Sequence, residues 1–154
     1  MEFYTPSYKV IIAGTRSFTD YEFVKKEIAR IVSEKATTTD SQGNIITSTF
    51  NITSILSGGA QGADKLGERY AKDNKIPCVV YSAKWDKFGK SAGPIRNIEM
   101  ANHADALIAF WDGQSKGTQH MIDAMLERQK EVHVIQVTIP EDPRKRKTLE
   151  KYLK

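Results

Sequence analysis

Three segments of the sequence combine glycine with serine, threonine, arginine or aspartate, a mixture that suits the binding of a phosphate group. They are residues 14–18 (GTRSF), 57–64 (SGGAQGAD) and 111–118 (WDGQSKGT). Glycine lets a ligand approach the backbone closely, and the free N–H groups at the start of a helix attract anions. A tight turn explains glycine alone, but it does not require serine, threonine and arginine as well. The sequence therefore predicts a ligand that carries phosphate.

Charged and polar side chains in and near these segments could contact such a ligand directly. Arg16 and Arg96 can bind a phosphate, and Asn97 can bind a phosphate or a ribose, although Arg96 could instead form a surface ion pair. Asp64 and Asp112 can accept hydrogen bonds from ribose hydroxyl groups, or they can simply cap helices. The full set of ligand-binding candidates is Gly14, Thr15, Arg16, Ser17, Ser57, Gly58, Gly59, Gly62, Asp64, Trp85, Arg96, Asn97, Trp111, Asp112, Ser115, Gly117 and Thr118.

Four aromatic residues, Phe18, Trp85, Phe88 and Trp111, are expected in loops at the same edge as these segments. An exposed aromatic ring can stack on a base, whereas a buried one would close the rim of the core. Trp111 directly follows an apolar run, so a core position suits it nearly as well. Trp85 stands between charged residues and is harder to place in a core.

Several common kinds of site are excluded. Gly89-Lys90-Ser91 ends like a phosphate-binding P-loop, but Lys84 stands where that motif needs its first glycine, and no strand leads directly into it. No segment reads G-x-G-x-x-G, the fingerprint of dinucleotide-binding enzymes. One cysteine, Cys78, and three scattered histidines form no recognisable metal cluster. We therefore expect neither a metal nor a cofactor.

The elements that must position these residues alternate between strands and helices. Apolar runs predict five strands, and stripes of apolar residues predict four helices, the first of them opened by a capping box from Thr19 to Glu22. The expected fold class is α/β, a single Rossmann-like, doubly wound and mostly parallel five-stranded sheet with helices on both faces. Ligands bind to such sheets at the carboxyl ends of the strands. The five predicted strands are residues 10–13, 52–56, 78–81, 106–111 and 132–137.

The expected domain covers residues 1–139, and two segments do not follow the alternation. Residues 36–50 form a polar insertion, either a hairpin or a loop, and could serve as a lid or as an interface. Residues 140–154 form a basic tail. From Glu141 to Lys154 six basic and three acidic residues contribute +3 of the net charge of +4, which leaves +1 for the rest. A body so close to neutral does not favour nucleic acid as a partner.

The expected setting is the cytoplasm. No apolar run approaches the roughly 20 residues that cross a bilayer, the first residues do not resemble an export signal, and a single cysteine suits a reducing compartment. We expect no membrane partner, and we expect a homo-oligomer, which is common for this architecture.

Taken together and in order, five stretches of the chain resemble the SLOG superfamily, a Rossmann-like group named for DNA-processing Smf/DprA proteins and cytokinin-activating LOG enzymes. Within that superfamily the chain most resembles the small bacterial and phage group of YspA-like proteins. The similarity spans most of residues 9–136 and leaves out the insertion. The five stretches are residues 9–18, 56–64, 92–97, 104–113 and 115–118.

This resemblance implies a pocket for a nucleotide or a nucleotide-derived molecule, such as an ADP-ribose-like ligand. Members of the superfamily include sensors of such ligands, enzymes that cleave N-glycosidic bonds, and proteins that bind single-stranded DNA. LOG enzymes carry a functional arginine at the place of Arg96. Their catalytic glutamate, three residues after Gly-Thr, corresponds here to Met121, which can neither take a proton nor stabilise a positive centre. The weak candidates for a catalytic role are Arg96, Asp112 and His120, with Glu99 as a further substitute.

The first functional expectation is therefore a binding protein that senses or sequesters a nucleotide-derived small molecule. The alternative is an enzyme that hydrolyses the N-glycosidic bond of a nucleotide, as LOG phosphoribohydrolases do. The third is DNA binding through the basic tail. Whether the chain catalyses any reaction stays open at this point, as do the identity of the base and the number of phosphates.

Overall fold

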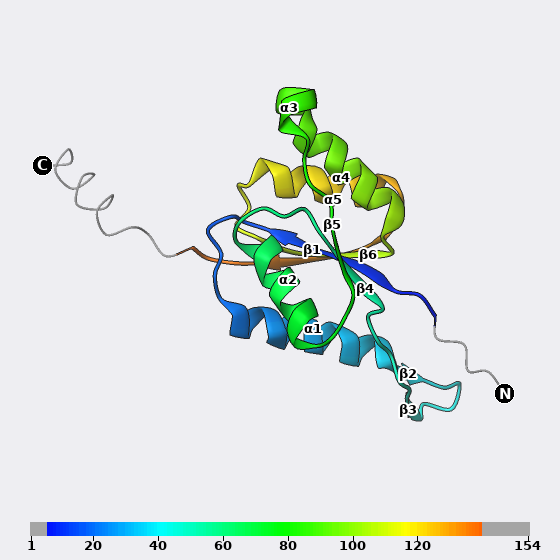
Figure 1. Cartoon of the computed structure of the whole chain (residues 1–154). Helices are drawn as coiled ribbons and strands as arrows, with labels where there is room; N and C mark the ends of the chain where they lie inside the picture. Colours follow the sequence, from blue (N-terminus) through cyan, green and yellow to red (C-terminus); the bar gives the residue numbers. More distant parts are fainter. Residues whose placement is uncertain (1–5, 140–154) are drawn as a thin grey trace, which may run out of the picture.

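The computed structural model describes residues 6–139, and these form three layers with a parallel sheet in the middle (Figure 1). The strands follow the order β5-β4-β1-β6-β7, and every neighbouring pair is parallel. The central strand β1 pairs with two neighbours, so that Ile11 lies beside Leu56 on one side and Leu107 on the other. The predicted fold class is confirmed. The strands are β1 (Lys9–Gly14), β4 (Ser54–Ser57), β5 (Cys78–Val80), β6 (Ala106–Trp111) and β7 (Glu131–Gln136).

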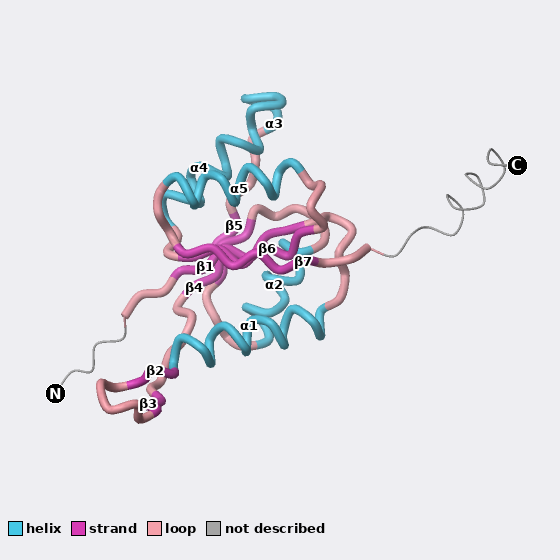
Figure 2. Tube along the Cα trace, turned by 180° about the vertical axis from the view of Figure 1, so that it is seen from behind, coloured by secondary structure: helices cyan, strands magenta, loops and turns pink. Residues whose placement is uncertain are grey.

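Two helices cover each face of the sheet (Figures 1 and 2). Successive residues of a strand point to opposite faces, so the apolar run of β1 supplies both cores. Val10 and Ile12 pack in the cluster that includes residues of the first helix pair, and Ile11 and Ala13 pack in the cluster of the second. The first pair is α1 (Tyr21–Ala36) and α2 (Ala63–Asp73), and the second is α4 (Ala92–His103) and α5 (Lys116–Glu127).

Two expectations about the segment before α1 are settled by the structure. The capping box from Thr19 to Glu22 is wrong, because Asp20 is the N-cap residue and its side chain accepts a hydrogen bond from the Phe23 N–H at 3.1 Å. A carboxylate is a good cap and also interacts favourably with the helix dipole. Phe18 is a core residue, since its ring stacks on that of Phe110 with the centroids 5.6 Å apart.

The polar insertion folds as a hairpin, the first of the two alternatives. Its strands β2 (Thr37–Thr39) and β3 (Ile45–Thr47) are antiparallel and exposed. The Asp40 side chain shapes the turn by accepting hydrogen bonds from the backbone N–H groups of Gln42 and Asn44. The hairpin extends from the end of α1, away from the carboxyl ends of the sheet strands (Figure 1). It therefore cannot act as a lid over a site at those ends.

Between β5 and α4 the chain forms two short elements where a loop was expected. They are α3 (Trp85–Phe88) and the 3-10 helix η1 (Gly89–Ser91), so the P-loop-like residues make a helical turn. Among the described residues no helix is long and apolar enough to span a membrane. Within residues 6–139 no group of three histidine, cysteine, aspartate or glutamate side chains could hold a metal ion. The basic tail lies outside the described residues.

Candidate functional site

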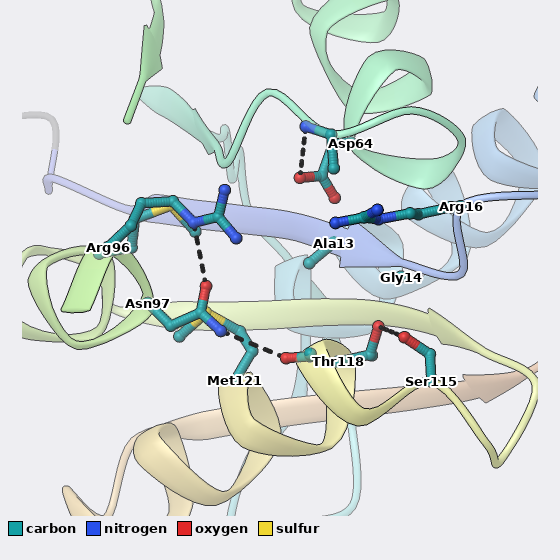
Figure 3. Close-up of a pocket in the computed structure, with 12 residues that line it drawn as sticks. Ala13, Gly14, Arg16, Asp64, Arg96, Asn97, Ser115, Thr118 and Met121 are labelled. Atoms are coloured by element: carbon teal, nitrogen blue, oxygen red, sulfur yellow. Dashed lines mark hydrogen bonds between the residues drawn. The ribbon is translucent and has the colours of Figure 1, made fainter. Parts of the chain in front are cut away.

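A pocket of about 60 Å³, here called the central pocket, lies at the carboxyl ends of β1 and β6 (Figure 3). This is where the strand order changes direction, the usual ligand site of a doubly wound sheet. The first turns of α2 and α5 and the middle of α4 surround it. The residues that line it are Ala13, Gly14, Arg16, Ala60, Asp64, Arg96, Asn97, Met100, Ser115, Gly117, Thr118 and Met121.

Close backbone contacts bring the glycine-containing segments together at this edge. Gly62 has φ of +80°, and a Cβ at this position would clash with the carbonyl groups of Thr15 and Arg16. At Gly14 a Cβ would clash with the carbonyl group of Phe110, whose oxygen accepts a hydrogen bond from the Thr15 N–H at 2.9 Å. The loops after β1, β4 and β6 therefore meet as the sequence predicted, and glycine is required for their contact.

Among the described residues, Asp64 is the one carboxyl group that lines the central pocket. Its side chain is only 6% exposed and lies in the first turn of α2, where Oδ2 accepts a hydrogen bond from the Ala60 N–H at 3.2 Å. Burial raises the pKa of Asp64 to about 6, although the Ala60 N–H and the charge of Arg96 oppose the shift. This carboxyl group therefore changes its protonation state close to neutral pH.

Arg16 and Arg96 extend into the pocket from opposite sides, below Asp64 in Figure 3. Arg96 is half-buried and donates from Nη1 to the Gly58 carbonyl oxygen at 2.7 Å and from Nε to Asn97 Oδ1 at 3.2 Å. Burial lowers the pKa of Arg96, and the nearby charge of Arg16 adds to this effect. Arg16 has neither a hydrogen-bond nor an ion-pair partner among residues 6–139. Two cations thus face one space, and a bound anion would relieve their repulsion.

The first turn of α5 closes the pocket from below in the same view (Figure 3). Ser115 is the N-cap residue, but its hydroxyl group pairs with that of Thr118 at 3.0 Å and leaves the backbone N–H groups of the turn uncapped. Such N–H groups carry the positive end of the helix dipole. The start of α5 and the two arginines therefore offer hydrogen-bond donors to the same volume.

Asn97 and Met121 form the wall between α4 and α5. The Asn97 amide group donates to the Gly117 carbonyl oxygen at 3.2 Å and contacts His120 Nδ1 at the same distance. Its hydrogen bonds are thus made within the protein, and they hold the two helices together. Met121 is buried in the wall and brings no proton-transfer group to the place where LOG enzymes carry glutamate. His120 contacts Asn97 but does not line the pocket.

A second pocket of about 410 Å³, here called the outer pocket, adjoins the central one and shares Arg16, Ala60 and Arg96 with it. It contains three of the predicted residues that the central pocket lacks: Gly58, Gly59 and Trp85. Gln61 was missed although it lies within the second glycine-containing segment. Ser82 and Ala83 were also missed, and their position directly after the third predicted strand was the signal that could have found them. The remaining lining residues are Lys65 and Val80.

The remaining predicted residues lie outside both pockets, and most of them shape the loops. Asp112 Oδ1 accepts hydrogen bonds from the N–H groups of Gln114 and Ser115, and its own N–H donates to Thr15 Oγ1 at 3.0 Å. Trp111 Nε1 donates to the Ser115 carbonyl oxygen at 3.0 Å. The six predicted residues that line neither pocket are Thr15, Ser17, Ser57, Gly62, Trp111 and Asp112.

Comparisons with known proteins agree with this architecture. The chain is 39% identical over 82 residues to the Gene 61 protein of Mycobacterium phage D29, an alignment that covers 49% of this chain and 63% of that protein. Its fold is similar to that of DNA processing protein A (DprA) from Streptococcus pneumoniae, with a TM-score of 0.62 and 17% identity. That likeness covers 94% of this chain and 56% of DprA, and at this identity it shows the fold alone.

The chain thus spans less than two thirds of the length of either protein. A family model matches residues 8–88, which include β1, β4 and both glycine-containing segments that follow them. The resemblance to the SLOG superfamily is therefore confirmed. The chain belongs to the YspA, cpYpsA-related SLOG family.

Proposed function

We propose that the protein binds a nucleotide-derived small molecule and that a phosphate of this ligand lies in the central pocket between Arg16 and Arg96. The observation that carries the proposal is the meeting of two guanidinium groups with the uncapped first turn of α5. Arg16 has neither a hydrogen-bond nor an ion-pair partner within the described residues. A phosphate would accept charge-assisted hydrogen bonds from both side chains and from the helix N–H groups.

The hydroxyl groups at the pocket suit the sugar of such a ligand. Ser115 and Thr118 line the wall and bond to each other, so each can exchange a partner with a ribose hydroxyl group. Asp64 on the opposite wall can accept from a second hydroxyl group when it is ionised. Family membership supports a nucleotide-related ligand, and an ADP-ribose-like molecule is the form that the proposal names.

The proposal is tested by calorimetric titration of AMP, ADP and ADP-ribose into the wild type and into Arg16→Ala. Loss of a charged hydrogen-bond partner costs about 1.5–3 kcal/mol, so the variant should bind roughly 10- to 150-fold more weakly. Arg30→Ala is the matched control, because Arg30 lies on the exposed face of α1 and pairs only with neighbours on that helix. If none of these ligands binds the wild type at millimolar concentration, the proposal is wrong.

Asp64 supports hydrolysis of an N-glycosidic bond as a second candidate function. In that reaction the bond from ribose C1′ to the base nitrogen breaks and its electron pair stays on the base, which takes up a proton. Water adds its oxygen to C1′ and gives up a proton. A carboxyl group whose pKa is raised to about 6 can supply and accept these protons. Chromatography should then show free base from AMP or ADP-ribose with the wild type and none with Asp64→Asn.

A further inference from the structure

We propose that the outer pocket binds the base of the nucleotide and that Trp85 stacks on it. This inference rests on the proposed function and adds where the rest of the ligand lies. The two pockets meet at Arg16, Ala60 and Arg96. A ligand whose phosphate lies between the arginines therefore has one end in the central pocket and the other in the outer pocket.

The size of the outer pocket fits this role. Its volume of about 410 Å³ falls within the roughly 300–1,000 Å³ of small-molecule sites. The central pocket is much smaller, at about 60 Å³. Of the two neighbouring spaces, the outer one is therefore the one with room for a purine or pyrimidine base.

Trp85 offers the stacking surface. It is the first residue of α3, it lines the outer pocket, and it remains 53% exposed. The edge of its indole ring packs against Gly93, where a Cβ would lie 3.4 Å from Cη2. Its Nε1 has no hydrogen-bond partner in the part of the chain that the structure describes. A large, half-exposed ring on the wall of a pocket suits a planar, aromatic partner.

The polar groups around Trp85 favour a nucleotide over an uncharged aromatic ligand. Among residues 6–139, three cations line the outer pocket, Arg16, Lys65 and Arg96, and no carboxylate does. Gln61 also lines it and carries both a donor and an acceptor, as recognition of a base edge requires. The pocket thus combines an aromatic platform, one amide group and positive charge.

Fluorescence titration can isolate this contact, because the chain has two tryptophans and, of these, Trp85 lines the outer pocket while Trp111 lines neither of the two pockets described above. AMP should quench the emission of Trp111→Phe, which retains Trp85, and should leave that of Trp85→Phe unchanged. Ribose 5-phosphate has no base and should bind to both without quenching. Quenching of Trp85→Phe that equals the quenching of Trp111→Phe would overturn the proposal.

Affinity measurements give the second test. Stacking contributes about 1–3 kcal/mol per base, so Trp85→Ala should weaken AMP binding roughly 5- to 150-fold and leave the affinity for ribose 5-phosphate unchanged. Phe88→Ala is the control, since Phe88 lies on the same short helix but lines neither pocket. It should bind both ligands as the wild type does.

The possible failures can be told apart. If Trp85→Ala binds AMP as tightly as the wild type does, the base subsite is wrong while the phosphate site stands. An equal loss of affinity for AMP and for ribose 5-phosphate would also overturn the base subsite, because Trp85 would then support the whole site. A change in oligomeric mass with unchanged AMP affinity would make Trp85 an interface residue and end the proposal. If the wild type binds neither ligand, the proposed function fails as well.

Discussion

Asp64 makes the start of α2 different from a simple phosphate-binding turn. Its carboxyl group accepts the Ala60 N–H and lies so close to Gly58 that a Cβ there would be 2.9 Å from Oδ2. A negative charge in the first turn of a helix already interacts with the positive end of the dipole. The Asp64 side chain therefore already occupies the start of α2 as an internal anion. A phosphate finds more favourable donors at the start of α5 and on the two arginines than at the start of α2.

Substitution of Asp64 by Asn should change how stability depends on pH. The folded-state pKa of Asp64 is about 6, against an ordinary value of 3.8 for an aspartate side chain. The folded state therefore holds its proton more tightly than the unfolded state, and this stabilisation is lost as pH rises from about 4 to 6. Asp64→Asn should not show this loss. The free energy of unfolding of the variant minus that of the wild type should therefore be more positive at pH 7 than at pH 4, by on the order of 2–3 kcal/mol. Urea unfolding at both pH values measures it, and a difference that does not vary with pH would refute the raised pKa.

Gly62 tests whether the loops need their close contact. In Gly62→Ala the new methyl group would meet the Thr15 and Arg16 carbonyl groups in addition to the strain of a positive φ, a strain that costs about 1–3 kcal/mol. Gly43→Ala is the matched control, because Gly43 has φ of +84° with open space around it. Thermal unfolding should show a clearly larger loss for Gly62→Ala. Equal losses would mean that the loops tolerate a wider separation.

At the scale of elements, the sequence predicts those whose residues repeat a pattern. Strand β1 is apolar on both faces because helices cover both, and its run of Val10 to Ala13 shows this directly. Helix α3 has only four residues, so it has no period to detect, and it was expected as a loop. Ser82 and Ala83 follow an exposed edge strand and carry no glycine signal. Helix α3, which places Trp85 at the outer pocket, therefore became visible only in the structure.

Glu131 joins β7, α1 and the segment before β1 at the amino ends of the strands. It begins β7, pairs with Lys35 of α1 at 2.5 Å, and accepts hydrogen bonds from Tyr8 and from His133 when Nε2 of that ring is protonated. Burial would raise the pKa of Glu131, but these hydrogen bonds outweigh it and lower the pKa. The network thus fixes the end of α1 next to the start of β7.

Glu131→Gln should destabilise the protein by about 1 kcal/mol, since the partners are partly exposed and screened by water. A lowered pKa means that the contribution is present above the unfolded-state pKa and is lost as pH falls through the folded-state value. The difference between variant and wild type should therefore be largest near neutral pH and should shrink in acid. Glu34→Gln, which affects a surface pair on α1, is the control. Thermal unfolding at pH 7 and pH 4 measures the stability difference between variant and wild type. A difference that grows in acid would contradict the prediction.

At the scale of the whole molecule, the proposed ligand would join parts of the chain that are far apart in sequence. Arg16 follows β1, Asp64 follows β4, and Thr118 follows β6, yet all three line the central pocket. The sequence could predict this convergence because parallel strands of a doubly wound sheet end at one edge. It could not predict that Asn97 would use its amide group to connect α4 to α5, because that depends on how the two helices pack.

Hydrogen exchange should therefore show protection at several separate segments when AMP or ADP-ribose binds. The ligand binds only the folded state and holds together loops that open locally in its absence, so exchange should slow in residues 14–17, 58–64 and 115–118. The β2–β3 hairpin lies away from the carboxyl ends of the sheet strands and serves as the internal reference. Its exchange rates should not change when the ligand binds. In Arg16→Ala the protection should fall at all three segments together, because one phosphate connects them. Protection confined to a single segment would mean that the loops bind independently, and the ligand would then not lie at the point where they meet.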